Sequence, residues 1–503
     1  MISARRGLPR IDCELGKGHR AMKCPQLRNY LALPTIVMLT ASVALGQSPT
    51  LSPLSFPAEP GLPTLVDQPW SNIEQPLRLP AAEETAGSVG PLVSAANSGS
   101  SASGAAPAQA ADGDYFTLPE LQEEMKKLVW TKGEFKIVPY GFLWGNMVYA
   151  AGRTVPGSYT LYVPPASTQG EDEFVIDVRN TRLGFDVTGP AIPYFNNAAS
   201  GGKVEIDFQN SVLTTENKPT LMLRHAYFEV KNEQARLLVG QTWDIISPLI
   251  PGTLMYSVGW CGGNMGYRRA QFRYERYLDF SDISLATLQV SVNQQVFEDP
   301  VTRPAPGLSI VGEPPDWPIV QMRVGWTLGP RGKGGRPITF GVSGHIGEEQ
   351  FDVYQGSTLV NQALKRRTWS VNADIRIPIT DRFGVQGEFF TGENLGAFLG
   401  GIGQGIDSIT FNCIRSNGGW IELWYDFTPR LHTRVGYSID DPVDGDLTNG
   451  NGRIFNQFYY ANLSYDFTKS FMTGIEVSSW RTLYLNQTAG DSVRVELVMK
   501  YGF

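Results

Sequence analysis

Hydrophobic and polar residues alternate with a period of two along most of the chain. In the last segment, Val493, Val495 and Leu497 fall on one face, and Arg494 and Glu496 fall on the other. This period is typical of a β-strand, in which successive side chains point to opposite faces. One apolar face and one polar, often charged, face recur in segments throughout residues 134–503.

Sixteen segments of this kind can be distinguished, and the connections between them mostly alternate between short turns and long Gly-, Pro- and Asn-rich loops. The segments are 134–150, 174–189, 201–211, 220–232, 235–244, 265–279, 283–297, 318–329, 337–350, 368–380, 383–394, 418–428, 431–440, 456–468, 471–485 and 491–503. The long loops include 245–264, 298–317, 351–367, 395–417 and 441–455. Residues 424–433 resemble residues 464–473, and this repeat contains two strands, one short turn and one long loop.

These features predict an all-β fold, a transmembrane antiparallel β-barrel of about 16 strands over residues 133–503. Hydrocarbon cannot hydrogen-bond the backbone, so a sheet that spans a bilayer must close on itself. Sixteen tilted strands give a diameter of roughly 30 Å, which predicts a water-filled lumen lined by the polar face. A soluble β-sandwich also alternates, but it does not explain the loop asymmetry.

Aromatic residues support the membrane interpretation. Tyr425, Phe427, Tyr465 and Phe467 precede short turns, where an interfacial girdle is expected.

The amino-terminal part has a different composition. Residues 1–46 are predicted to be a signal peptide, because Lys23 and Arg28 precede an apolar stretch that ends at the small residues Ala44 and Gly46. Met22 is an alternative initiator. Residues 47–113 are rich in Pro, Ser, Ala and Gly and are predicted to be a disordered periplasmic linker. Residues 114–132 are predicted to contain a short helix.

The 503 residues contain 42 Lys plus Arg and 49 Asp plus Glu, a formal charge of −7 that becomes −12 without residues 1–46. This balance argues against a nucleic-acid partner. Beyond the amino terminus there is no apolar run of 18 residues, which excludes a bundle of transmembrane helices. Cys261 and Cys413 remain in the mature chain, and a disulfide between them is predicted, with two unpaired thiols as the alternative.

Several motifs resemble those of a known family. FKIVPYGF (135–142), TRLGF (181–185), LRHAY (223–227), GQTW (240–243) and NMGYRR (264–269) together look like DcaP-type trimeric outer-membrane porins, within the bacterial general porins. The last strand, with Tyr501 and the terminal Phe503, resembles the insertion signal of outer-membrane barrels. The resemblance implies a homotrimer in outer-membrane lipid, contact of the last strand with the barrel-assembly machinery, and small anionic, often dicarboxylate, solutes.

The loop 245–264 follows the fifth strand, from which general porins fold a loop into the lumen. It contains no Lys or Arg, and Asp244 precedes it. This apolar loop is predicted to face basic wall residues across a constriction, and the candidates are Arg179, Arg182, Arg236, Arg269, Arg273 and Arg323. Arginine suits carboxylates because its guanidinium stays charged and offers paired donors. The alternative is that these arginines pair with inward acids such as Asp177 and Glu275.

The sequence leaves two other functions open. An enzyme is disfavoured, because His225, His345 and His432 lie on separate strands without metal-ligand spacing, and no cofactor, metal or catalytic site is predicted. For a barrel phospholipase, Ser343 with His345 is the nearest candidate pair. The other alternative is a plugged structural or cell-wall-anchoring barrel.

Overall fold

The computed structural model describes residues 129–503, except 210–218, 297–307, 333 and 449–451. The predicted signal peptide 1–46, the linker 47–113 and most of the predicted helix 114–132 lie outside the described residues. In the described part, no helix is long and apolar enough to span a bilayer.

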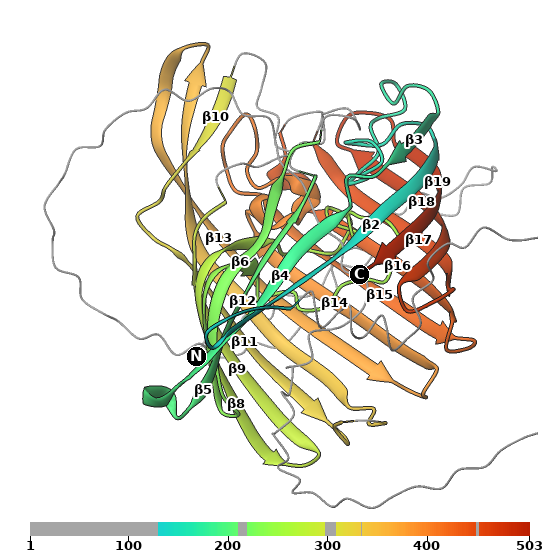
Figure 1. Ribbon diagram of the computed structural model, residues 1–503. Coiled ribbons are helices and arrows are strands. Elements are labelled where there is room, and N and C mark those ends of the chain that lie inside the picture. The colour runs from blue at the N-terminus through green and yellow to red at the C-terminus, as the bar shows by residue number, and fades with distance from the viewer. Residues whose placement is uncertain (1–128, 210–218, 297–307, 333, 449–451) are drawn as a thin grey trace, which may run out of the picture. The chain divides into compact units, whose positions relative to one another are not determined.

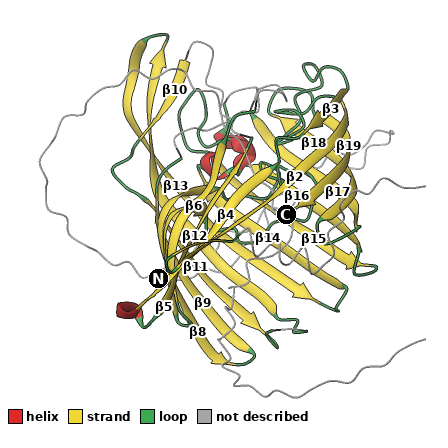
Figure 2. Cartoon of the chain, viewed as in Figure 1, coloured by secondary structure: helices red, strands yellow, loops and turns green. Residues whose placement is uncertain are grey.

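Strands that pair antiparallel with their neighbours close into a barrel (Figures 1 and 2). They are β1 (Trp130–Lys132), β2 (Phe135–Ala151), β3 (Glu173–Asp177), β4 (Arg182–Ile192), β5 (Ala198–Asp207), β6 (Met222–Lys231), β7 (Ala235–Trp243), β8 (Arg268–Ser281), β9 (Ser284–Asn293), β10 (Leu308–Glu313), β11 (Ile319–Leu328), β12 (Ile338–Gln355), β13 (Thr358–Pro378), β14 (Phe383–Glu393), β15 (Arg415–Asp426), β16 (Leu431–Pro442), β17 (Arg453–Asp466), β18 (Phe471–Tyr484) and β19 (Gly490–Gly502). Four short 3-10 helices, η1 (Pro193–Phe195), η2 (Gly396–Phe398), η3 (Gly401–Gly403) and η4 (Asp444–Asp446), lie in connections.

The barrel wall has sixteen positions, as predicted. β3 and β4 pair with successive parts of β2 and occupy one position, while β1 and β10 are short additions. The ring closes between the two ends of the chain, where β19 pairs with β2 from Val493 opposite Ala151 to Gly502 opposite Phe142. The predicted closed antiparallel barrel is therefore confirmed.

The alternation of the sequence corresponds to the two surfaces of this wall. Val435, Leu463 and Val477 point outward and are about half exposed, whereas Glu422 and Glu476 point inward and are almost fully buried. The outer surface is apolar and the inner surface is polar, the reverse of a soluble protein and the arrangement that a bilayer requires.

The aromatic pairs of the predicted girdle lie together at one end of the barrel. The ring centroids of Tyr425 and Phe427 are 4.9 Å apart, and those of Tyr465 and Phe467 are 5.0 Å apart.

Three of the short turns share one local design. The hydroxyl of Thr380 accepts hydrogen bonds from the backbone N–H groups two and three residues later, and Thr428 and Thr468 do the same in their turns. A threonine hydroxyl that replaces a backbone acceptor in this way stabilises a tight turn. The 40-residue repeat seen in the sequence reflects this turn and the strands on either side.

One predicted strand is interrupted. The segment 174–189 is two strands, β3 and β4, because the chain turns at 178–181 instead of continuing straight. Asp177 accepts a hydrogen bond from the backbone N–H of Arg179 (2.9 Å), and Thr181 N–H donates to the carbonyl of Val178 (3.0 Å). Short-range bonds of an Asp to its own backbone compete with ladder pairing, which alternation alone does not reveal.

Two predicted loops and part of the predicted helix are also strands. β12 and β13 extend through most of 351–367 as a hairpin, and β10, in the predicted loop 298–317, pairs with β12. These segments lack clean alternation because they stand beyond the barrel rim, as the upper part of Figure 1 shows. Residues 130–132, predicted to end a helix, form β1 and pair with β2.

The carboxyl terminus extends the pairing of β19 with β2, called here the seam. Phe503 and Gly141 exchange two backbone hydrogen bonds of 3.0 and 3.1 Å, and the side chains of Tyr501 and Phe503 face outward. Recognition of this strand by the assembly machinery remains a prediction.

The outward parity can be tested at Leu463. Leu463→Arg places a charge on the lipid face, one outward position from the girdle residue Tyr465, and is expected to lower the free energy of unfolding in lipid by about 1–2 kcal/mol. Leu463→Phe is expected to change it little. Urea titration of the protein in bilayers measures both. Equal stability of the arginine and phenylalanine variants would contradict a lipid-facing Leu463.

Candidate functional site

The connection between β7 and β8, residues 244–267, folds into the barrel and is called here the inner loop. Asp244 fixes its two ends together, because its carboxylate accepts hydrogen bonds from Tyr267 N–H (2.8 Å) and Gln321 Nε2 (2.6 Å) and pairs with Arg269 Nε (2.9 Å). Asp244, predicted from the sequence to stand at the entry of the loop, is thus a structural anchor that holds the two ends of the loop together.

Three wall glutamates hold residues 245–256, called here the first arm of the inner loop. Glu388 accepts from Leu249 N–H (2.7 Å) and Ser247 Oγ, and Glu422 accepts from Gly252 N–H. Glu476 accepts from Thr253 Oγ1 (2.5 Å) and Leu254 N–H (2.6 Å). These acids come from β14, β15 and β18, so the arm follows the inner wall.

The first arm ends at Tyr256, which contacts arginine side chains of the wall. Its hydroxyl donates to Asp207 Oδ2 (2.9 Å) and accepts from Arg182 Nη2 (3.1 Å) and Arg224 Nη1 (3.4 Å). The inner loop therefore joins an acidic stretch of wall, on β14 to β18, to a basic one on β4 to β6.

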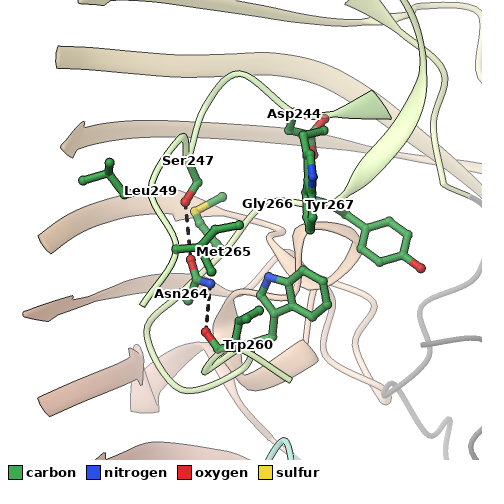
Figure 3. A pocket seen from close by; sticks show the side chains of 11 residues that line it. Asp244, Ser247, Leu249, Trp260, Asn264, Met265, Gly266 and Tyr267 are labelled. Atoms are coloured by element: carbon green, nitrogen blue, oxygen red, sulfur yellow. Dashed lines mark hydrogen bonds between the residues drawn. The ribbon is translucent and has the colours of Figure 1, made fainter. Parts of the chain in front are cut away.

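A small hollow lies between the two arms of the inner loop (Figure 3). Its lining includes Asp244, Trp260 and Tyr267, and side chains fill most of it. Asn264 crosses it, accepting from Ser247 Oγ (3.4 Å) and donating to the carbonyl of Val258 (2.9 Å). These internal bonds make the hollow a part of the fold of the loop.

Three of the predicted wall arginines lie beside the inner loop. Arg182 contacts Tyr256, Arg269 pairs with Asp244, and the Arg269 guanidinium also donates to the carbonyl of Ala397 (2.9 Å). Arg273 lies 3.5 Å from Glu275 and bonds Gln271.

The other three predicted arginines are held elsewhere. Arg179 pairs with Asp177 (2.6 Å) in the turn between β3 and β4. Arg236 pairs with Glu229 near the short turn between β6 and β7, and Arg323 pairs with Asp374 (2.7 Å) on the neighbouring wall. Arg182 also lies 3.6 Å from Glu205, so acid pairing, the alternative considered from the sequence, describes all six.

Four arginines that were not among the predicted site residues also take part in the site. Arg224 and Arg268 are almost fully buried beside Arg182 and Trp243. Arg434 lies against Gly252 of the inner loop, and Arg376 lies over the Trp424 ring. Arg376 and Arg434 could have been selected, because both occupy inward positions of alternating strands. Arg224 and Arg268 are displaced from regular alternation by a register shift and a strand end.

The lumen is fuller than the sequence predicts. Besides the inner loop, residues 152–172 and 394–414 also turn inward and pack together on one side of it. Their contact is apolar, and the buried members of the cluster are Tyr159, Leu161, Tyr162, Tyr256, Val258, Trp260, Cys261, Leu399 and Ile402. We call this cluster the apolar seal.

The predicted disulfide is absent. Cys261 is buried in the apolar seal, where its N–H donates to the carbonyl of Leu399 (2.8 Å). Cys413 instead lies near the surface. Its backbone forms an isolated antiparallel β-bridge with Ile406, and its sulfur lies 3.6 Å from the carbonyl oxygen of Arg367. The two sulfurs are held in different surroundings by their own contacts.

Ser343 and His345 do not form a nucleophile and base pair. Ser343 Oγ donates to the carbonyl of Ile246 (2.7 Å), and the ring nitrogens of His345 contact the hydroxyls of Ser370 (2.7 Å) and Thr368 (2.8 Å). No cluster of His, Cys, Asp and Glu suited to a metal ion occurs among the described residues.

The fold is similar to that of solved outer-membrane channels. The outer membrane channel DcaP of Acinetobacter baumannii matches with a TM-score of 0.57 and 20% sequence identity, covering 74% of this chain and 99% of that one. OmpF of Salmonella typhi, in complex with daunomycin, matches with a TM-score of 0.47 and 13% identity, covering 75% of this chain and 100% of that one. OmpT of Vibrio cholerae matches with a TM-score of 0.46 and 10% identity, with the same coverage of the two chains. No protein-family model and no curated protein matches the sequence. The resemblance to DcaP-type barrels is thus confirmed in the fold.

Gly252 allows the inner loop to approach the wall. A Cβ there would lie 2.0 Å from Arg434 Cδ and 3.0 Å from Glu422 Oε2. Gly252→Ala is therefore expected to displace the first arm and to destabilise the fold by about 1–3 kcal/mol. Urea titration measures the loss. Gly145→Ala, where no atom lies within 4 Å of the added Cβ, is the control, and equal stability of both variants would contradict close docking.

Asp407 connects residues 394–414 to the next long loop. Burial alone would raise its pKa, but hydrogen bonds from Thr448 and Thr410 outweigh burial and lower the pKa to about 2. A carboxyl whose folded pKa lies below its usual 3.8 stabilises the fold above pH about 4, and this contribution is lost as pH falls through 2.

We expect Asp407→Asn to be cleaved by pepsin in residues 394–414 faster than the wild type at pH 4, with the difference shrinking toward pH 2. The ratio of the two rates cancels the pH dependence of pepsin itself. A ratio that stays constant over this range would contradict the role assigned to the Asp407 carboxylate.

Proposed function

We propose that the chain is a porin of the bacterial outer membrane that passes small hydrophilic solutes and prefers carboxylate anions. Support comes from the closed barrel with its apolar exterior, the charged lumen, and the similarity of its fold to outer-membrane channels. The amino-terminal linker would lie in the periplasm, and the assembly would be a homotrimer.

Two guanidinium groups carry the proposed anion preference. Arg434 pairs in register with Trp424, and the Arg376 guanidinium lies 4.8 Å from the Trp424 ring centre. Within the described residues, neither arginine is joined to a carboxylate by a salt bridge, and Arg376 Nε is buried without a hydrogen-bond partner. Both are only partly buried overall, so they can present charge and donors to a solute.

The acids close to this pair are less available. Glu388 and Glu422 accept hydrogen bonds from the inner loop, which covers them, and Glu422 also accepts from Tyr460 and Gln386. Donors that surround a carboxylate reduce its effect on a passing ion. Glu422 offsets part of the Arg434 charge, but the Arg434 guanidinium makes no hydrogen bond to another side chain among the described residues and keeps its donors for a solute. This part of the lumen is therefore expected to favour anions even though the chain as a whole is acidic.

A plugged structural barrel is the second candidate, and the apolar seal is the observation that favours it. Nine buried apolar side chains in the lumen leave little room for water among them. Planar-bilayer conductance separates the two functions, because a permanently plugged barrel gives no current steps.

The selectivity prediction concerns Arg376 and Arg434. Arg376→Gln with Arg434→Gln is expected to lower the anion-to-cation permeability ratio by about two- to fivefold, since two positive charges leave the lumen. Reversal potentials under a salt gradient measure the ratio.

Arg481→Gln is the matched control, because Arg481 is exposed on the outer surface and pairs with Asp491. Cation selectivity of the wild type, or an unchanged ratio in the double variant, would overturn the proposed anion preference.

A further inference from the structure

Residues 394–407 fill the lumen next to the inner loop. Leu399 and Ile402 enter the apolar seal, and Phe398 lies against the Arg269 guanidinium, 3.9 Å from its ring centre. Gly266 N–H donates to the carbonyl of Phe398 (2.8 Å), and Cys261 N–H donates to that of Leu399 (2.8 Å). This segment, called here the plug segment, is thus held to the inner loop by two backbone bonds and apolar contacts.

The backbone is strained where the two segments touch. Val258 and Cys261 of the inner loop have φ of 43° and 59°, and Leu399 and Ile402 of the plug segment have φ of 59° and 53°. Positive φ is unfavourable for side chains with a Cβ, most of all for branched ones. All four residues belong to the apolar seal, so this contact holds four of the nine non-glycine residues with positive φ in the described part of the chain. Strain of this kind persists only while the surrounding contacts impose it, and it is typical of elements with two states.

Leu395, Ala397 and Phe398 of the plug segment also pack in a second apolar cluster with Ile319 and Phe390 of the wall, and the segment's other contacts are single hydrogen bonds. Ile402 N–H donates to Asp440 Oδ2 (2.9 Å), Gln404 bonds the carbonyl of Arg453 (2.8 Å), and the Ala397 carbonyl accepts from Arg269. Five glycines, at 396, 400, 401, 403 and 405, give the segment backbone freedom. Asp407 is fixed to Thr448 at the end of the segment, which provides a stationary base.

We propose that the plug segment is a displaceable gate, which leaves the inner loop and opens the apolar seal when the channel conducts. Release of the four strained residues offsets part of the cost of exposing their side chains. The gate rests on the proposed porin function, since a permanently plugged barrel needs no moving segment.

A reversible cross-link tests the gate. A Cβ on Gly401 would lie 3.8 Å from the Cβ of Ser416, the separation typical of a disulfide. In a Cys413→Ser background, oxidised Gly401→Cys with Ser416→Cys ties the plug segment to β15. We expect oxidation to lower single-channel current at least tenfold, and reduction by dithiothreitol to restore it. Undiminished current with the cross-link formed would overturn the gate.

Cys261 gives a measurement that does not depend on current. It is fully buried in the apolar seal, so a small charged thiol reagent reaches it only after the seal opens. Labelling, mapped by mass spectrometry of the full protein in liposomes, is expected to be slow in the wild type and slower still in the oxidised cross-linked protein. Equal labelling rates in the two proteins would count against the gate.

Gly401→Ala is expected to favour the open position of the plug segment. Gly401 has φ of 64°, and the only atom within 4 Å of an added Cβ is Ser416 Cβ, so alanine adds strain without a clash. We expect Cys261 labelling to be about three- to tenfold faster than in the wild type. Gly445→Ala is the control, because its φ is not positive and its Cβ meets no atom within 4 Å.

Failure of the gate and failure of the porin function give different results. A protein that conducts equally when oxidised and when reduced, with Cys261 labelled equally in both, is a porin without this gate. A protein that gives no current in either state, but in which the cross-link blocks Cys261 labelling, has the moving segment and lacks the proposed transport.

Discussion

The structure depends on one constraint, that no backbone N–H or C=O group in the wall may face hydrocarbon without a partner. Strands such as β12 to β18 satisfy this requirement through both of their neighbours, and the first and last wall strands satisfy it by pairing β19 with β2. Once the sheet is closed, every second side chain must face inward. The chemistry of the lumen is therefore a consequence of how the wall avoids unpaired backbone groups.

Inside the wall, the balance of charges decides where the inner loop lies. Its first arm contains no basic residue, yet it binds three glutamates through backbone N–H groups and hydroxyls. A loop with lysines would bind the same acids more tightly but would add positive charge to the lumen. Because the loop neutralises these acids with dipoles, it adds no positive charge beside Arg434.

Much of the fold could be predicted from sequence, because alternation reports directly on the two environments of a barrel wall. Strands such as β14 and β18 agree with the predicted segments to within a residue or so. The turn at 178–181 and the hairpin at 351–367 could not be predicted, since one depends on side chain to backbone bonds and the other lies beyond the bilayer. The fold of the inner loop was expected only by resemblance, and the pairing of Arg236 with Glu229 needs the register of two strands. The strained contact between Cys261 and Leu399 joins residues far apart in sequence, and no local pattern encodes it.

The seam has a consequence for how the molecule assembles. Asn146 and Glu496 bond each other across a sequence separation of 350 residues, whereas the threonine turns close between neighbouring residues. Because the entropy lost in closing a loop grows with its length, the hairpins can form early and the ring forms last. Until that moment both edge strands expose unsatisfied ladders, which invite aggregation. The newly made chain must therefore be shielded at its two edge strands until they pair. A soluble protein whose sheet edges are covered needs no such shielding.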